Sequence, residues 1–281
     1  MTQRCLYLKP SRQKKVAKAF RYCVARAATL TGVKVHIVVV MGNHYHLIVS
    51  DPLGLLPYFT ECLNKNLARC LNSLYSRGEN FWAGAVTPSY VRLDSPADVL
   101  EKCAYALVNP VEAGLVSARK LWPGELLEQP GVYKAPKPGW FFRPEDEGGE
   151  LPDIAYLELT PAPASSTAAE SIRLIREAAD ARQKMLRTAR LAEGKSFLGA
   201  DAVLRQKIDG SPNSFEPRRT LSPTLACRDK WRRIELLQAT TEFRRDYKSA
   251  MEQWMAGNRE AVFPLGTYKM RVIHRARIAE A

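Results

Sequence analysis

Two histidines in the segment 34–50 are spaced for a shared chemical task. His44 and His46 follow a β-branched run and a Gly-Asn pair, a combination that predicts a β-hairpin with a tight turn. Side chains on a strand alternate between faces, so both imidazoles project from one face and Tyr45 from the other. Two imidazoles one pleat apart can grip one metal ion, because His is the commonest metal ligand. An exposed strand face that happens to carry two histidines explains the pair equally well.

A tyrosine farther along the chain lies on the polar side of a predicted helix. This helix begins at Ser95-Pro96, a capping serine followed by a first-turn proline. At about 100° per residue the sector around Tyr105 also holds three polar residues, Asp98, Lys102 and Asn109. The opposite side is apolar, so we expect it to be buried and the Tyr105 side to face outward. A lone exposed tyrosine is usually surface decoration, and the helix alone assigns it no function.

The elements that position these residues follow a definite order. We expect a strand over 2–8, a helix over 12–30, the hairpin over 34–50, a helix over 55–77, a strand over 89–93 and then the Tyr105 helix. This order indicates the split βαβ plan of a ferredoxin-like α+β domain, with an antiparallel sheet and helices on one face.

Taken together, the two segments resemble a known family. Gly42-Asn43-His44-Tyr45-His46-Leu47 is similar to the His-hydrophobic-His motif of the single-tyrosine HUH transposases. The segment 105–116, which starts Tyr-Ala-Leu-Val-Asn-Pro, resembles that family's tyrosine helix in the form found in REP-associated tyrosine transposases. The resemblance covers about residues 1–122, and the two motifs match in order and separation. Gly42 departs from the family, which often has Pro or Ser there.

This resemblance implies a reaction on single-stranded DNA. Tyr105 would attack the scissile phosphate, giving a 5′-phosphotyrosine and a free 3′-hydroxyl. His44, His46 and the amide oxygen of Asn109 would hold one divalent ion, Mg²⁺ or Mn²⁺, on a phosphate oxygen. Two imidazoles and an amide oxygen suit these ions but do not exclude Zn²⁺ or Ni²⁺ by affinity. The implied target lies beside a repeated hairpin or palindromic element, and two chains are able to exchange tyrosine helices in a homodimer.

Lys102 precedes Tyr105 by almost one helical turn and falls in the same sector. The phenol of tyrosine has an ordinary pKa near ~10, so its deprotonation needs help from metal-bound water or a neighbouring group. An ammonium group beside the ring would lower that barrier electrostatically. We therefore name Lys102 as the second candidate catalytic residue, on helical phase alone.

The charge balance favours a polyanionic partner. The formal net charge is +13, and no Asp or Glu precedes Asp51. One-signed clustering of this kind suits a phosphate backbone, although a solvated basic face has the same composition. The candidate DNA-binding residues are Arg4, Arg12, Lys14, Lys15, Lys18 and Arg21, together with Trp82 as a stacking platform for unpaired bases. A loop aromatic such as Trp82 is as often a lid over the core.

The remaining composition is that of an ordinary globular protein. Of 281 residues, 46% are hydrophobic and 25% charged, and no apolar run approaches the ~20 residues that a membrane span needs. The six cysteines form no Cys-x-x-Cys pair, and the N-terminus has no apolar signal region, so we expect a cytoplasmic protein without a membrane partner.

Three regions are expected along the chain: a catalytic domain over 1–122, a Pro- and Gly-rich linker or extended loop over 123–167, and a basic helical accessory DNA-binding region over 168–281. The favoured function is a metal-dependent transposase that cleaves and rejoins DNA. The alternative is a non-catalytic, domesticated protein that binds single-stranded DNA or RNA on the same fold. RNA recognition would need aromatic residues on the central strands, where His44 and His46 stand instead.

Overall fold

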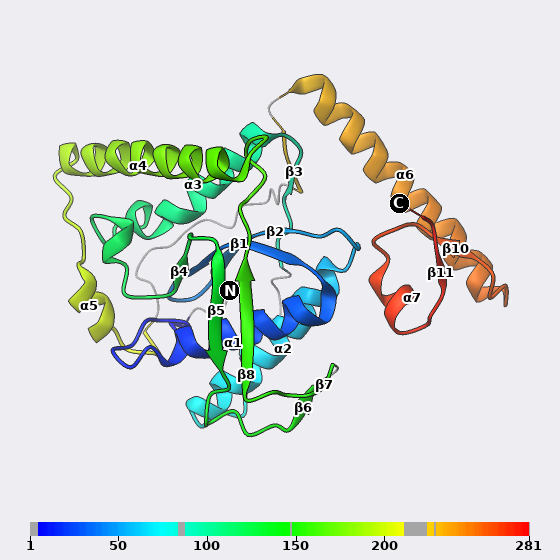
Figure 1. Cartoon of the computed structure of the whole chain (residues 1–281), viewed down its shortest axis with the longest axis horizontal. Coiled ribbons are helices and arrows are strands. Elements are labelled where there is room, and N and C mark those ends of the chain that lie inside the picture. The colour runs from blue at the N-terminus through cyan, green and yellow to red at the C-terminus, as the bar shows by residue number, and fades with distance from the viewer. Residues whose placement is uncertain (1–4, 84–87, 147, 211–223, 228, 281) are drawn as a thin grey trace.

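The computed structural model of the chain describes residues 5–83, 88–146, 148–210, 224–227 and 229–280. Within these ranges it is an α+β fold with seven α-helices and a mixed sheet of five strands (Figure 1). The helices are α1 Lys15–Thr31, α2 Leu56–Leu74, α3 Pro96–Glu112, α4 Ala168–Ala192, α5 Ala200–Arg205, α6 Lys230–Met255 and α7 Tyr268–Val272, with a 3-10 turn at Arg119–Leu121. The sheet strands are β1 Lys34–Val40, β2 Tyr45–Ser50, β4 Leu126–Leu127, β5 Gly131–Pro136 and β8 Ile154–Leu159. Short two-stranded pairs are β3 Arg92–Leu93 with β9 Leu225–Ala226, β6 Glu145–Asp146 with β7 Gly149–Glu150, and β10 Val262–Phe263 with β11 Arg277–Ile278.

Strand β1 is buried on both of its faces. It is a nearly continuous β-branched run, the composition of a strand covered on both sides. Val38 and Val40 belong to the core beneath α1 and α2, whereas Ile37 and Val39 belong to a second core beneath α3 and α4. The expectation that helices cover one face of the sheet is therefore wrong: Figure 1 shows α1 and α2 on one side and α3 and α4 on the other.

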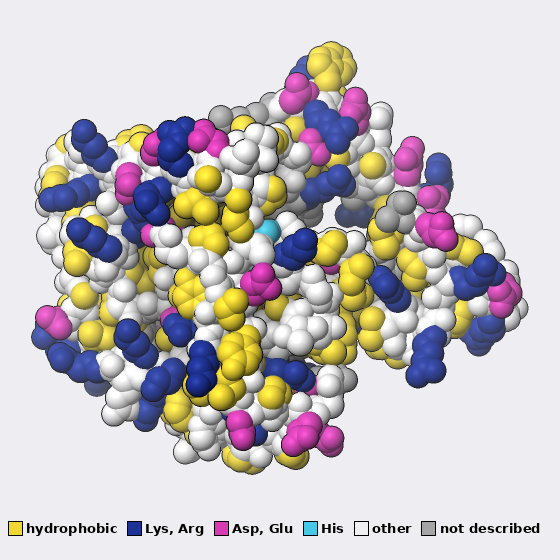
Figure 2. Space-filling view, viewed as in Figure 1, with side chains coloured by type: hydrophobic (Ala, Val, Ile, Leu, Met, Phe, Trp, Pro, Cys, Tyr) yellow, Lys and Arg dark blue, Asp and Glu magenta, His cyan; other side chains and the backbone are white. Residues whose placement is uncertain are grey.

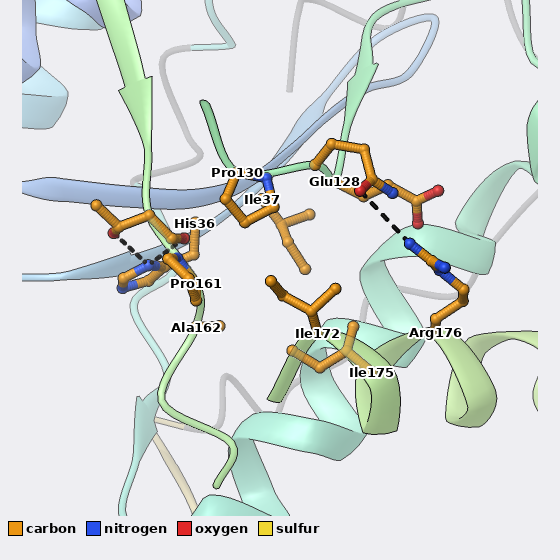
Figure 3. A pocket seen from close by; sticks show the side chains of 11 residues that line it. His36, Ile37, Glu128, Pro130, Pro161, Ala162, Ile172, Ile175 and Arg176 are labelled. Carbon is orange, nitrogen blue, oxygen red and sulfur yellow. Dashed lines mark hydrogen bonds between the residues drawn. The ribbon is translucent and has the colours of Figure 1, made fainter. Parts of the chain in front are cut away.

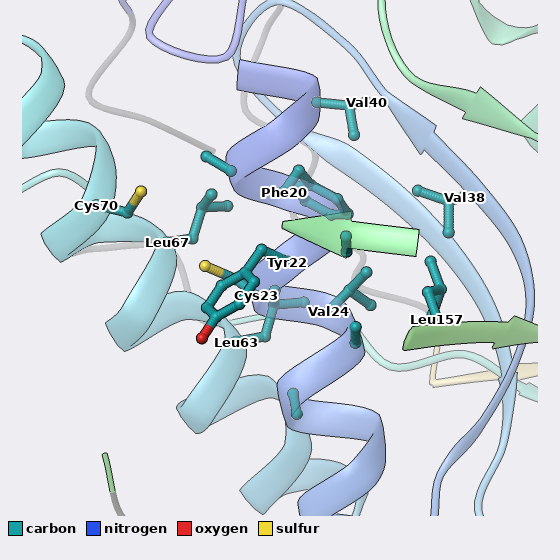
Figure 4. Close-up of a cluster of buried hydrophobic side chains, with 14 of the residues drawn as sticks. Phe20, Tyr22, Cys23, Val24, Val38, Val40, Leu63, Leu67, Cys70 and Leu157 are labelled. Atoms are coloured by element: carbon teal, nitrogen blue, oxygen red, sulfur yellow. The ribbon is translucent and has the colours of Figure 1, made fainter. Parts of the chain in front are cut away.

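The first core holds most of the large, fully buried side chains among the described residues. Phe20 and Tyr22 of α1 pack with Leu63 and Leu67 of α2 and with Val38 of β1 (Figure 4). All of these side chains are essentially inaccessible to solvent. The apolar faces of α1 and α2 are thus the ones that bury against the sheet.

The sheet is mixed, not antiparallel as expected. Its order is β2-β1-β8-β5, with β4 pairing β1; β8 runs parallel to β1, and the other pairings are antiparallel. The segment 123–167 is consequently not an extended loop, because β4, β5 and β8 come from it. Prolines and glycines are frequent in this segment, but Ile154–Leu159 alternates exposed and buried positions as a strand requires.

A ferredoxin-like arrangement is not confirmed. The expected strand over 2–8 falls partly outside the described residues, and its described part, 5–8, forms no strand. Leu8 instead donates its backbone N–H to the carbonyl of Gly42 at 2.9 Å. β3 pairs with β9 and not with the main sheet. The place beside β1 is taken by β8, which arrives from much later in the chain.

The end of the chain forms a smaller helical unit beside α2. Phe263, Met270 and Ala276 make a small core against α6. Tyr268 stacks on Tyr58 of α2, with ring centroids 6.3 Å apart. Among the described residues, no helix combines the length and apolarity that crossing a bilayer demands.

The placement of β8 in the core predicts the effect of shortening one of its side chains. Leu157 is fully buried, so Leu157→Ala should lower the free energy of unfolding by about 2–5 kcal/mol, measured by urea denaturation. Glu158→Ala, its exposed neighbour on the same strand, is the control and should change it by less than about 0.5 kcal/mol. Equal, small effects of both substitutions would contradict a core strand here.

Candidate active site

The hairpin that carries the histidines has the predicted turn. Val40 pairs with Tyr45, and Met41 donates its N–H to the carbonyl of His44 at 2.9 Å, which leaves Gly42 and Asn43 as the two turn residues. The faces are also as predicted. Tyr45 packs against Phe20 of α1, with ring centroids 5.1 Å apart, and so lies on the side of the first core.

The two imidazoles lie on the opposite side, against α3. The ring centroids of His44 and His46 are 5.0 Å apart, and the ring of Tyr105 lies 5.8 Å from that of His46 in an edge-to-face arrangement. Asn109, one turn after Tyr105, lies close enough to both imidazoles to raise their pKa values. The fold thus brings the pair His44 and His46 next to Tyr105 and Asn109, which belong to a segment distant in sequence.

Burial keeps the histidine pair neutral. Loss of solvent, followed by repulsion from His46, lowers the pKa of His44 to about 4, against a raising contribution from Asn109. Burial also lowers the pKa of His46, while Asn109 and then Glu112 oppose the shift. Neutral imidazoles retain a lone pair, which is the form that binds a metal ion.

A buried ring nitrogen of this pair has no hydrogen-bond partner in the part of the chain that the structure describes. Nε2 of His46 is buried and makes no hydrogen bond to any described residue, whereas Nδ1 of His44 is bonded to Oδ1 of Asn43 at 2.7 Å. A buried polar atom without a partner is costly, and a bound cation would satisfy it. The described residues hold no cluster of three or more His, Cys, Asp or Glu arranged for a metal. Asn109 lies beside both imidazoles, and its amide oxygen is the further donor that an ion held by this pair would meet. The donor set of two neutral imidazoles and one amide therefore fits a divalent ion.

Helix α3 begins as its sequence predicts, but its polar sector is not exposed along its whole length. Ser95 caps the helix through a reciprocal bond with Asp98. Asp98 and Asn109 are buried, so the polar sector does not face outward as a whole: Tyr105 stays half-buried between β2 and α4. The sector is covered because α4, absent from the expected domain, packs along α3.

Two cations contact the ring of Tyr105. Nζ of Lys102 lies 5.8 Å from the ring centroid, as helical phase predicts. Cζ of Arg182, from α4, lies 5.4 Å from the same centroid. Sequence reasoning missed Arg182, because α4 carries several arginines at different angles and only the packing of α4 on α3 selects one of them.

The predicted DNA-binding residues that the structure describes lie around the start of α1. Lys14 and Lys18 are exposed, and Lys15 is half-buried. Arg12 lies 3.6 Å from Asp201, and Arg21 pairs with Glu125 at 2.7 Å. Arg4 falls outside the described residues. This end of α1 adjoins the hairpin turn, since Leu8 and Glu125 both bond backbone atoms near that turn.

Trp82 lies away from the histidine pair. It is half-buried, packs on Tyr45 with ring centroids 6.0 Å apart, and donates its indole N–H to the carbonyl of Asn64. Since Tyr45 and His46 project from opposite faces of β2, Trp82 covers the first core. The lid reading of this residue has the structural support, and base stacking beside the imidazoles does not.

The basic side chains on the surface are scattered. On the face of the molecule seen in Figure 2, Lys and Arg side chains have acidic side chains between them and do not form one continuous basic patch.

A small pocket lies between β1, the segment after β8 and α4 (Figure 3). It is lined by His36, whose two ring nitrogens bond the carbonyl of Thr160 and the hydroxyl of Ser50. Both ring nitrogens of His36 are thus satisfied, and His36 is a structural histidine.

Comparison of the chain with protein-family models, with curated proteins and with solved structures found no match.

The environment of the pair predicts its titration. In metal-free buffer, His44 should titrate with a pKa of about 4 and His46 below the ordinary histidine value, because burial disfavours both imidazolium forms. Two-dimensional NMR of the imidazole nitrogens, assigned with His44→Gln and His46→Gln, measures both values. A His44 that becomes charged near pH 6.5 would contradict the buried pair.

Proposed function

We propose that this protein is a metal-dependent DNA strand transferase that cleaves and rejoins single-stranded DNA through Tyr105. One observation carries the proposal: the Tyr105 ring lies 5.8 Å from His46, which is itself packed on His44, with Asn109 one helical turn away. A nucleophile and a ligand set for a cation thus share one location. The motif resemblance to single-tyrosine HUH transposases agrees with this reaction class.

The reaction is a transesterification without water. The hydroxyl oxygen of Tyr105 forms a bond to the scissile phosphorus, the bond from phosphorus to the 3′-oxygen breaks, and the phenol proton ends on that leaving oxygen. The products are a 5′-phosphotyrosine and a free 3′-hydroxyl. Because phenolate is itself a reasonable leaving group, the 3′-hydroxyl of another strand reverses the step and rejoins the DNA.

The protein side chains would divide the work as follows. His44, His46 and Asn109 would hold one divalent ion, Mg²⁺ or Mn²⁺, whose bound form would neutralise charge on a non-bridging phosphate oxygen. Lys102 would oppose negative charge that gathers at the reacting atoms during the attack, since its Nζ lies 5.8 Å from the Tyr105 ring centroid. Asn43 orients the His44 ring by its bond to Nδ1, a supporting contact of the kind that metal-binding histidines usually have.

The DNA would approach along the end of the sheet that carries the hairpin turn. Lys14, Lys15, Lys18 and Arg12 are the described cations there that suit backbone phosphates, and Arg21 is engaged with Glu125. A repeated hairpin beside the cleavage point is the target class that the resemblance implies. We place the reaction in the cytoplasm, a compartment in which cysteines stay reduced. None of the six cysteines forms a disulfide in this structure.

Two finer points belong to the proposal. Of the ferredoxin-like plan, the order α1, β1, β2, α2, β3 and α3 agrees with the expectation, whereas residues 5–8 form no strand and β3 pairs with β9. A homodimer is compatible with the reaction, but Tyr105 already lies beside the imidazoles of its own chain, which favours a site completed within one chain. The non-catalytic alternative differs in one respect: it needs DNA or RNA binding but no adduct.

Tyr105→Phe separates these alternatives. Incubating wild type with labelled single-stranded hairpins and Mn²⁺ should give a covalent protein–DNA adduct, since the phenol supplies the nucleophile. Tyr105→Phe should abolish it and still bind DNA. Tyr156→Phe, which alters a more exposed phenol, should leave adduct formation unchanged. Denaturing gels score the adduct, and mass spectrometry of the linked peptide locates it. DNA binding without any wild-type adduct would favour the non-catalytic protein.

Metal removal tests the ligand set. Adduct formation should stop in excess chelator and return with Mn²⁺ or Mg²⁺. In calorimetric titrations, Mn²⁺ should bind Tyr105→Phe, while His46→Ala should lose about tenfold or more in metal affinity. His274→Ala, at an exposed histidine near the end of the chain, is the control and should bind as wild type does. Full adduct formation in chelator would contradict the metal's role.

A further inference from the structure

The guanidinium group of Arg182 is placed against the proposed nucleophile by a helix outside the motif region. Its Cζ lies 5.4 Å from the ring centroid of Tyr105. Arg182 belongs to α4, which packs along α3 in the second core. Strands β4 to β8 and the first part of α4 lie between Tyr105 and Arg182 in the sequence. The two residues therefore meet only in the folded chain.

Arg182 is held in place with part of its bonding capacity unused. Its Nη2 lies 3.3 Å from Oε2 of Glu112, and its Nε is buried with no hydrogen-bond partner among the described residues. A guanidinium has five N–H donors in a rigid fork that matches the geometry of a phosphate. Glu112 therefore fixes the fork from one side and leaves a buried donor beside the Tyr105 ring.

The other arginines of α4 that have assigned partners are engaged differently. Arg173 bonds Glu170 and Glu177 of its own helix, Arg176 donates to Oε1 of Gln129 at 3.5 Å, and Arg190 donates from Nε to the carbonyl of Ser196. Among the described arginines of α4, Arg182 is the one with a buried nitrogen left without a partner. Arg26 and Arg77 also leave Nε buried and without a partner among the described residues, so what distinguishes Arg182 is its position beside the Tyr105 ring.

We infer that Arg182 binds the phosphodiester that Tyr105 attacks, with Lys102 as the second cation of the same anion site. This inference rests on the proposed function and extends it to a residue outside the segment 1–122. A guanidinium donating to a non-bridging oxygen opposes the charge that gathers on the phosphate in the transition state. The active site then includes α4, and the catalytic unit extends at least to Arg182.

The test compares variants in single-turnover adduct formation at saturating single-stranded DNA and Mn²⁺. Arg182→Ala should lower the rate constant by about 10²-fold or more, the usual loss when one fixed donor to a developing oxyanion is removed. Arg182→Lys should recover part of that loss. Arg176→Ala, which removes a positive charge from an exposed site on the same helix, is the matched control and should stay near the wild-type rate. Millimolar guanidinium ion should accelerate Arg182→Ala and leave wild type unchanged.

A structural role for Arg182 makes different predictions. If the pair with Glu112 only joins two helices, Glu112→Gln should slow the reaction and lower the melting temperature as much as Arg182→Ala does. In our inference Glu112→Gln retains most of the rate, because the guanidinium remains beside Tyr105. A wild-type adduct with an undiminished rate in Arg182→Ala, or equal losses in both variants without guanidinium rescue, overturns the inference alone. Absence of any wild-type adduct overturns the proposed function and the inference together.

Discussion

The burial of β1 on both faces is the constraint on which the rest of the molecule depends. A strand of nearly unbroken β-branched residues gains most from burial when both sides are covered. Helices α1 and α2 cover one side, and α3 and α4 cover the other. From Ile37 to Val40 the pairing of β1 with β2 has no register shift, so the facing residues of β2 inherit the same two environments. Tyr45 enters the first core, and His46 is turned toward α3.

The proximity of the histidines to Tyr105 follows from this arrangement. The apolar side of α3, with Leu107 and Val108, packs on Ile37 and Val39 of β1. That contact fixes the height of α3 over the sheet, and β2 lies next to β1. Tyr105 and Asn109 then project over the start of β2. Burial of the imidazole pair has an electrostatic consequence as well, since it holds both rings in the neutral form that can ligate a cation.

The later half of the chain completes the same structure. Strand β8 takes the central position beside β1, and α4 packs along α3. Gly114 allows the chain after α3 to turn, at φ 69°, and its missing side chain leaves room for Arg190 of α4. Residues 123–192 are therefore part of the fold that supports the candidate site. A boundary drawn at 122 would divide the sheet and remove one of the cations on Tyr105.

The sequence by itself determined the local features. The Gly42-Asn43 turn, the shared face of His44 and His46, the Ser95 cap and the helical phase of Tyr105 and Asn109 depend on spacings within one or two turns of the chain. Such short-range patterns leave few conformations to choose from.

Only the tertiary structure decided how the elements combine. The parallel pairing of β8 with β1, the burial of Asn109 and the choice of Arg182 among the arginines of α4 depend on contacts between segments distant in sequence. The frequent prolines and glycines of 123–167 indicate a loop when the sequence is taken alone. The strands in this segment carry only a short alternation of apolar and polar residues, and they are stabilised by partners distant in sequence. The sequence periodicity of α4 does not distinguish Arg182 from the other arginines of the helix. Which arginine meets Tyr105 depends on how α4 packs against α3.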